Sequence, residues 1–184
     1  EYITVPKRTL LKVPGHKFEK YPFGVFTYFK YQVADDDGQP TSETVTIATT
    51  RLETLLGDEA VAINSKDKRY THLHGKRIYH PFRKITIPII LDDVLVDMDF
   101  GTGVVKVTPA HDPNDFETGI RHHLPFTNIL TEDGKINDLV PEFAGMPRFD
   151  ARIAIRKALE DLGLFDHEED HEMRLGITQR GHDI

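Results

Sequence analysis

The sequence predicts an α+β domain in which short strands form a β-barrel-like core and helices lie at its periphery. Three observations support this fold class. Short runs of β-branched and apolar residues recur along most of the chain, whereas only two segments have helical periodicity. The length of 184 residues suits one domain that buries a substantial core.

The first predicted elements form a hairpin. Residues 22–34 alternate between two sets of side chains, and both sets are apolar enough for a strand inside a barrel or between layers. Asp36, Asp37 and Gly38 predict a turn, after which residues 43–50 form the returning strand. One helical turn is expected at 53–59. Further short strands, with an edge or bulge at Pro88, are expected at 60–63, 76–80, 84–91, 94–98 and 103–108.

The first predicted helix covers residues 112–124. Asp112 suits the N-cap, and Pro113 suits the first helical position, where no N–H group is needed. Phe116 and Ile120 lie four residues apart, so they are expected to form the buried stripe of this helix.

The second predicted helix begins at Asp150, taken as its N-cap, and ends before Gly163. Helical spacing predicts an apolar stripe facing the core, formed by Ile155, Ala158, Leu159 and Leu162.

Composition excludes several classes of function. The chain has no cysteine, which excludes disulfides, thiol catalysis and zinc knuckles and favours a reducing compartment. No apolar run approaches the roughly 20 residues of a membrane helix, and no secretory leader opens the sequence, so a cytoplasmic location without a membrane partner is expected. The net charge of −7 argues against tight nucleic-acid binding, although residues 66–87 form a locally basic segment that is either an RNA-facing surface or a solvated loop.

The segment 98–119, MDFGTGVVKVTPAHDPNDFETG, carries the chemistry. Because strand side chains alternate, Lys106 and Thr108 share one face of strand 103–108, and the opposite face is expected to meet the core. Asp112 and Asp115 follow at the start of the next helix, where carboxylates are favoured. The sequence therefore predicts a pocket wall with an ammonium, a hydroxyl and two carboxylates.

Two other interpretations of this segment stay open. Asp112 and Asp115 are equally explained as groups that cap a helix, with Lys106 as a solvated strand residue. A metal site formed by His111, Asp112 and Asp115 has plausible ligand types, but no second histidine completes the set at a suitable spacing.

Several ordered blocks resemble the editing domain of valyl-tRNA synthetases, which is inserted into a class I catalytic core. One block is the Gly-Thr-Gly turn followed by Lys106-Val-Thr-Pro-Ala-His-Asp; the isoleucyl branch usually has His at position 106, and the leucyl branch Met. Leu52 departs from the proline usual in the second block, but the Thr-Thr-Arg triplet is intact. The remaining blocks are Ala48–Thr54, Leu56–Asp58, Ala60–Ala62, Arg69–Tyr70 through Gly75–Lys76, His80–Phe82 and Gly145–Arg152.

The resemblance implies a deacylase that hydrolyses threonine wrongly esterified to tRNA(Val), with threonyl-adenylate as an alternative substrate. Threonine and valine are near isosteres, and an apolar pocket rejects an added hydroxyl only about a hundredfold, a limit established with valyl-tRNA synthetase itself. A second site must therefore favour the hydroxyl, because valine would leave its hydrogen-bond partner unpaired.

The resemblance also implies roles for individual residues. Asp115 would bind the substrate α-ammonium, while Asp112, Lys106 and Thr108 would complete the catalytic pocket. Binding of the terminal adenosine and its ester would fall to Thr49, Thr50 and Arg51, with Phe100 stacked on the adenine. An aminoacyl ester is already activated, so a positioned water and a stabilised oxyanion suffice; Lys106 and the N–H groups at the helix start are both candidates for the oxyanion.

The resemblance implies partners and boundaries as well. The partners are the threonine-bearing acceptor end of tRNA(Val) and the rest of the parent synthetase; no metal or cofactor is needed, and ATP is used only by a catalytic core. Residues 1–184 form one editing domain, with 1–20 and 175–184 as linker strands to that core. Alternatives are an isoleucyl or leucyl editing domain, a non-catalytic tRNA-contacting module, and a metal hydrolase. Adenylation motifs of the His-Ile-Gly-His and Lys-Met-Ser-Lys-Ser types do not occur in the sequence.

Overall fold

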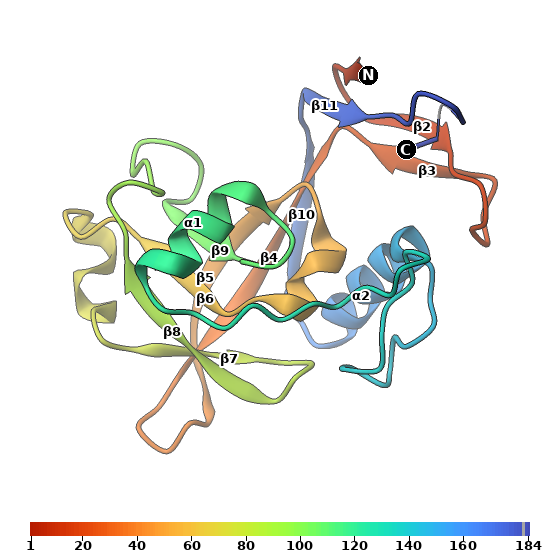
Figure 1. Ribbon diagram of the computed structural model, residues 1–184. Helices are drawn as coiled ribbons and strands as arrows, with labels where there is room; N and C mark the ends of the chain where they lie inside the picture. The colour runs from red at the N-terminus through yellow and green to blue at the C-terminus, as the bar shows by residue number, and fades with distance from the viewer. Residues whose placement is uncertain (182) are drawn as a thin grey trace.

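A computed structural model describes residues 1–181 and 183–184 (Figure 1). Its largest sheet has seven strands in the order β10-β4-β7-β8-β6-β9, with β5 also paired to β4. All pairs are antiparallel except β6 with β8. The bounds of these strands are β4 Val25–Ala34, β5 Pro40–Thr49, β6 Ala60–Ile63, β7 Arg77–His80, β8 Ile85–Leu91, β9 Val104–Val107 and β10 Phe165–Asp170.

Two small antiparallel sheets form a separate lobe, at the upper right of Figure 1. The first pairs β1 (Tyr2–Val5) with β11 (Met173–Gly176), so segments near the two ends of the chain lie side by side. The second pairs β2 (Thr9–Lys12) with β3 (Lys20–Phe23). The curled main sheet and its few helices confirm the predicted α+β class with a barrel-like core.

The predicted strand at 22–34 is interrupted at Gly24, between β3 and β4. Gly24 has a φ of +74°, and a Cβ there would lie 2.3 Å from the carbonyl oxygen of Lys7, so only glycine fits this position. The break lets β3 pair within the small lobe while β4 continues into the main sheet.

The segment 94–98 was expected to be a strand, and this prediction is wrong. Asp92 accepts hydrogen bonds from the backbone N–H groups of Val94 and Leu95, which fold the chain into a turn. The apolar composition resembled that of a strand, but a local side-chain to backbone bond competes with pairing here. The short helices η1 (Leu52–Gly57) and η2 (Lys68–Leu73) are 3₁₀ helices, and η1 matches the helical turn expected at 53–59.

Helix α1 (Pro113–Arg121) has the predicted N-cap: Asp112 accepts hydrogen bonds from the N–H groups of Asn114 and Asp115. Its predicted buried stripe is wrong, because Phe116 and Ile120 are 45% and 50% exposed. The buried face is polar and small and consists of Asp115, Thr118 and Gly119. A Cβ at Gly119 would lie 2.8 Å from the Pro109 side chain, so the helix packs too closely on this loop for a larger residue.

Helix α2 (Arg148–Asp161) has Pro147 as its N-cap, three residues earlier than predicted. Asp150 is not its N-cap; the Asp150 carboxylate instead accepts hydrogen bonds from the Lys17 N–H and the Tyr21 hydroxyl, which tie the small lobe to the helix. Ile155 and Leu159 are fully buried as predicted, whereas Leu162 is 54% exposed at the end of the helix. Gly163 follows with a φ of +72°, as expected for a helix stop.

The predicted division of strand β9 into a pocket face and a core face is only partly correct. Both faces are buried: Val104 contributes to the main core, and Val107 packs in a smaller cluster with Ala60 and Ala62. Lys106 therefore enters the protein interior and is only 8% exposed. No helix among the described residues is long and apolar enough to cross a membrane.

Replacement of Leu159 by alanine tests the packing of α2. Because Leu159 is fully buried in the main core, Leu159→Ala is expected to lower the free energy of unfolding by about 2–5 kcal/mol. Leu162→Ala on the same helix is the control, and its effect is expected to stay within about 0.5 kcal/mol. Equal denaturation midpoints for the two variants would contradict this description of the core.

Candidate functional site

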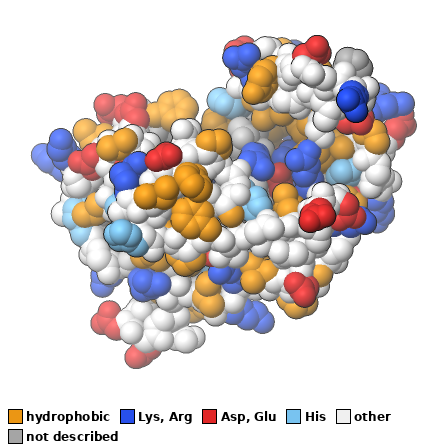
Figure 2. Space-filling model, in the orientation of Figure 1, with side chains coloured by type: hydrophobic (Ala, Val, Ile, Leu, Met, Phe, Trp, Pro, Cys, Tyr) orange, Lys and Arg blue, Asp and Glu red, His pale blue; other side chains and the backbone are white. Residues whose placement is uncertain are grey.

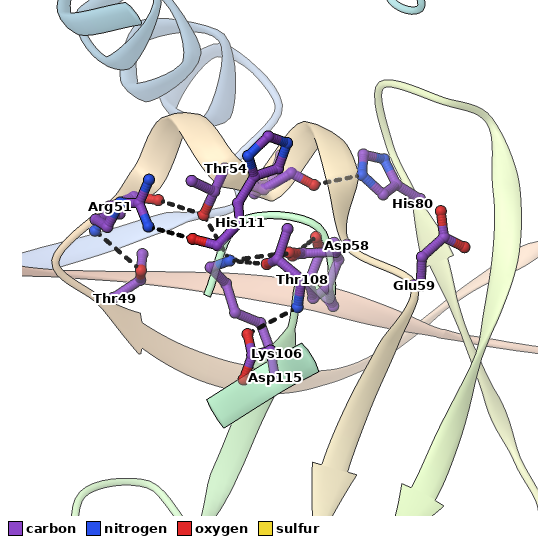
Figure 3. Close-up of polar contacts among 12 residues, drawn as sticks. Thr49, Arg51, Thr54, Asp58, Glu59, His80, Lys106, Thr108, His111 and Asp115 are labelled. Carbon is purple, nitrogen blue, oxygen red and sulfur yellow. Dashed lines mark hydrogen bonds and ion pairs between the residues drawn. The ribbon is translucent and has the colours of Figure 1, made fainter. Parts of the chain in front are cut away.

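A cavity of about 260 Å³ brings together seven of the eight predicted site residues. They come from the end of β5, the start of η1, strand β9 and the start of α1 (Figure 3). The seven residues are Thr49, Thr50, Arg51, Lys106, Thr108, Asp112 and Asp115, and the wall is completed by Phe26, Ala48, Thr54, Leu95, Val105 and Asn114. Segments almost 60 residues apart in sequence therefore share one cavity, as the pocket prediction required.

Lys106 is held by a buried ion pair with Asp58, a residue to which the sequence analysis gave no role. The Lys106 ammonium donates to Asp58 Oδ1 at 2.9 Å, to Thr54 Oγ1 at 2.8 Å, and to the Thr108 hydroxyl. An ammonium has three donors, and all three are used. Lys106 therefore lines the cavity, but in this arrangement it has no N–H left for a substrate oxyanion.

Asp58 is fully buried and collects further donors. Its carboxylate accepts hydrogen bonds from the Tyr31 hydroxyl at 2.6 Å and the Thr108 hydroxyl at 2.6 Å. Burial and the negative charge of Asp58 raise the pKa of Tyr31 well above its ordinary value, so this phenol stays a donor. The pairing of β6 with β9 explains the contact, since the Glu59 N–H donates to the Val107 carbonyl and sets Asp58 beside the end of β9.

Asp115 is a buried carboxylate of the cavity that forms no ion pair among the described residues. Its side chain is 7% exposed, and Oδ2 accepts the backbone N–H of Thr108 at 2.8 Å. Among the described residues no donor reaches Oδ1, and no cation forms an ion pair with this group. Burial raises the pKa of Asp115 to about 6, although the Thr108 N–H and the charge on Lys106 act in the opposite direction. A negative charge beside the cavity is thus left without a partner.

The N–H groups at the start of α1 are already occupied. Pro113 has none, Asn114 and Asp115 donate to Asp112 Oδ1, and Phe116 donates to the Asp112 carbonyl. The two oxyanion donors considered from the sequence, Lys106 and these N–H groups, are therefore both engaged within the protein.

The Thr-Thr-Arg triplet forms the opposite wall. The Arg51 guanidinium donates to the carbonyl of His111 at 2.5 Å, and the Arg51 N–H donates to Thr49 Oγ1 at 3.1 Å. The His111 ring accepts the Ile129 N–H through Nε2, and burial lowers its pKa, so the ring is a neutral structural acceptor. No group of three or more acidic or histidine side chains in the described part of the chain is placed to hold a metal ion.

Phe100 is the one predicted site residue outside this cavity. It lies in the turn before β9, is 65% exposed, and lines a neighbouring cavity of about 360 Å³. Phe26, Ala48 and Val105 line both cavities, so the exposed ring stands beside the site.

Asp58 and Thr54, which hold Lys106 in place, are the residues of this site that sequence reasoning missed. Asp58 lies two positions before the apolar strand Ala60–Ile63, where a carboxylate is costly unless it is paired. A buried Lys106 requires such a carboxylate, but the strand pairing that joins the two residues, which lie 48 positions apart, is not encoded in any local pattern.

Comparisons with known proteins define the class. The family described as "Leucyl-tRNA synthetase, editing domain" matches residues 62–142. Two solved structures have a TM-score of 0.57 to this chain. The ternary complex of Agrobacterium radiobacter K84 agnB2 LeuRS with tRNA and LeuAMS is 16% identical over 83% of this chain and 20% of its own, and GlLeuRS-CP1 is 12% identical over 80% and 99%. The fold is that of the synthetase editing domain.

Within that class, sequence similarity points to one synthetase. The chain is 60% identical over its full length to the valine–tRNA ligase of Trichomonas vaginalis, 52% to that of Schizosaccharomyces pombe, and 50% over 96% of its length to that of Homo sapiens. The chain spans between 14% and 38% of the length of these relatives. It is thus an editing domain of the valine–tRNA ligase type, as the sequence blocks indicated.

The buried ion pair gives a testable stability effect. Lys106→Met leaves the Asp58 charge buried and unpaired, so the variant is expected to lose about 3–5 kcal/mol of unfolding free energy. The double variant Lys106→Met with Asp58→Asn removes that charge and is expected to recover at least half of the loss. Urea denaturation of the two variants measures the difference; a double variant no more stable than the single one would show that the charge of Asp58 is not the cause.

Proposed function

We propose that this domain hydrolyses the ester of threonine wrongly attached to tRNA(Val). The observation that carries the proposal is the carboxylate of Asp115, which is buried, faces the cavity and has no cationic partner. An aminoacyl ester carries a free α-ammonium, and a charge-assisted bond to Asp115 would supply the missing positive charge. Water adds to the ester carbon, the bond to the ribose oxygen breaks, and threonine and tRNA with a free hydroxyl are released.

The rest of the cavity suggests how threonine is favoured over valine. The Thr108 hydroxyl and the Lys106 ammonium are engaged with Asp58, so they are poor partners for a substrate hydroxyl. Asp112 uses Oδ1 to cap α1, and among the described residues Oδ2 accepts no hydrogen bond. Asp112 Oδ2 is therefore the acceptor we assign to the threonine hydroxyl. Valine would leave this acceptor desolvated and unpaired.

The ester group itself lies against the Thr-Thr-Arg wall in this proposal. The Thr50 side chain lines the cavity and makes no hydrogen bond within the described part of the chain, so its hydroxyl can donate to the ester oxygen. Positioning the water and an already activated ester accounts for the reaction without a cofactor or metal. The acceptor end of tRNA(Val) and the remainder of the parent synthetase are the proposed partners; threonyl-adenylate is a further candidate substrate.

A non-catalytic tRNA-contacting module is the second candidate function, since Asp112 does cap α1.

A cytoplasmic location also stays a prediction, because the relatives include mitochondrial ligases of Arabidopsis thaliana and Saccharomyces cerevisiae.

One variant separates a catalytic role of Asp115 from a purely structural one. Asp115→Asn keeps an acceptor for the Thr108 N–H but removes the charge. Loss of one charge-assisted bond is expected to lower kcat/KM for Thr-tRNA(Val) by about 10- to 150-fold, equivalent to about 1.5–3 kcal/mol. Deacylation of Thr-tRNA(Val) and Val-tRNA(Val) by the wild-type and variant chains is the measurement, and wild-type hydrolysis by the variant would refute the assignment.

The same variant is expected to become more stable at pH 8. Asp115 has a pKa of about 6 in the folded protein, above the ordinary 3.8, so the native state binds more protons between these pH values. The contribution of Asp115 to the free energy of unfolding therefore falls as pH rises from about 4 to 6. Above pH 6 the ionised carboxylate lowers the free energy of unfolding by up to about 3 kcal/mol. Asp115→Asn removes this penalty. A melting temperature that falls at pH 8 would instead support a purely structural role for the carboxylate.

Phe100 provides a separate test of the adenosine contact. If its exposed ring stacks on the terminal base, Phe100→Ala is expected to raise KM for Thr-tRNA(Val) by an amount equivalent to about 1–3 kcal/mol. Phe116→Ala is the matched control, because Phe116 is similarly exposed but lines neither cavity. Indistinguishable KM values for the two variants would remove Phe100 from the site.

A further inference from the structure

A further cavity, of about 290 Å³, lies next to the proposed reaction site and is lined by four arginines. Figure 2 shows Lys and Arg side chains gathered in a hollow beneath the lobe that contains β1 and β11. Thr50 and Arg51 line both this cavity and the reaction cavity, so the two are contiguous. We call it the arginine cavity, after Arg51, Arg148, Arg152 and Arg174.

The arginine cavity holds an excess of positive charge. Among the lining residues that the structure describes, Glu53 is the single carboxylate, and Arg152 occupies both of its oxygens at 2.7 and 3.0 Å. Arg51 donates to the backbone carbonyl of His111, which carries no charge, and Arg148 donates to the backbone oxygen of Ile184. Four guanidinium groups against one carboxylate leave a charge of +3 in a chain whose net charge is −7.

This arrangement differs from that of three arginines elsewhere in the chain. Arg69, Arg83 and Arg121 each form an ion pair with a carboxylate, with Asp67, Glu59 and Asp92 respectively. Two of these three arginines belong to the basic segment 66–87, so that segment offers less free positive charge than its sequence indicated. The arginine cavity is a separate concentration of positive charge, and it lies directly beside the reaction cavity.

An aromatic ring also positions the side chains of the cavity. The Arg148 and Arg152 guanidinium groups lie over the Phe149 ring, at 4.5 and 4.8 Å from its centroid. Burial lowers the pKa of Arg148, and the charges of Arg51 and Arg152 lower it further while Glu53 raises it. Bringing these groups together is therefore unfavourable, and an anion in the cavity would relieve the repulsion. Planar guanidinium groups bind phosphate oxygens in bidentate fashion.

We infer that the arginine cavity binds a backbone phosphate of the RNA strand whose aminoacylated end enters the reaction cavity. The inference rests on the proposed function, and it adds a subsite on the side of the reaction cavity formed by Thr50 and Arg51. A single strand that carries an ester at its end carries phosphodiester groups immediately before it, so a cationic cavity contiguous with the ester site lies on its path.

The test uses two variants of the whole chain with the same change in charge. Arg148→Gln with Arg174→Gln removes two charges from the cavity but leaves Arg51 and Arg152 untouched. Lys12→Gln with Lys157→Gln is the control, because both lysines form exposed ion pairs that contribute little. Binding of tRNA(Val) without an attached amino acid is measured by fluorescence anisotropy over a range of KCl concentrations. Hydrolysis of Thr-tRNA(Val) is measured at steady state.

The cavity variant is expected to bind tRNA(Val) about tenfold more weakly than the control, with a slope of log K against log[KCl] reduced by about 1. Its KM for Thr-tRNA(Val) should rise while kcat stays within about twofold of wild type. Equal Kd values and slopes for the two variants would overturn the inference, even if wild-type hydrolysis confirms the proposed function. If wild type does not hydrolyse the ester, the proposed function fails and the tRNA-binding comparison still decides the subsite.

Competition by inorganic phosphate and ATP distinguishes the source of the phosphate. Weakened binding of tRNA(Val) supports an RNA-backbone site. Unchanged tRNA binding, combined with loss of inorganic phosphate or ATP binding in the cavity variant, would assign the cavity to a free phosphate compound and refute the RNA subsite.

Discussion

The ion pair between Lys106 and Asp58 is the interaction on which the site depends. It joins β9 to the segment before β6, and the Tyr31 hydroxyl extends the contact to β4. Both charges are buried, so each is tolerated only because the other is present and because hydroxyl groups satisfy the remaining positions. Thr108 belongs to this network through its hydroxyl, and its backbone N–H holds the Asp115 carboxylate. The position of the unpaired carboxylate is therefore fixed by a neighbouring pair that takes no direct part in binding.

Charge is balanced in the interior and left unbalanced at two places on one continuous depression. Asp115 leaves a negative charge beside the reaction cavity, and the arginine cavity leaves a positive charge of three. An aminoacylated RNA end carries the complementary pattern, with an ammonium at the amino acid and phosphates on the strand. Arg51 lines both cavities, so the boundary between the two charge environments lies at the Thr-Thr-Arg triplet. The two cavities have opposite charges in the same spatial order as the ammonium and the phosphates of the RNA end. This shared order, rather than either charge alone, connects the proposed reaction with the proposed RNA contact.

The sequence predicted what depends on local periodicity, and it failed where distant segments meet. Alternation along β9 and capping by Asp112 placed Lys106, Thr108 and Asp115 around one cavity, because both features are set within a few residues. The same logic assigned Phe116 to the core, but α1 approaches the Pro109 loop through Gly119 and buries its polar face instead. Asp58 and the arginine cavity could not be found in this way. Their partners come from β9 in one case and from η1, α2 and β11 in the other, and only the tertiary fold brings them together.

The unpaired charges also explain why this part of the domain is not optimised for stability. A first-turn carboxylate normally stabilises a helix by about 0.3–1 kcal/mol, whereas burial of Asp115 with a pKa near 6 outweighs that gain. Pairing Asp115 with Lys106 would remove the cost, yet Lys106 is directed to Asp58, and Asp115 is left with one backbone donor. The fold thus separates a cation and an anion that lie on the same cavity wall. This separation lowers the stability of the free protein. The lost stability is regained only when a ligand brings a positive charge to Asp115. Such behaviour is expected of a binding site rather than of a helix cap.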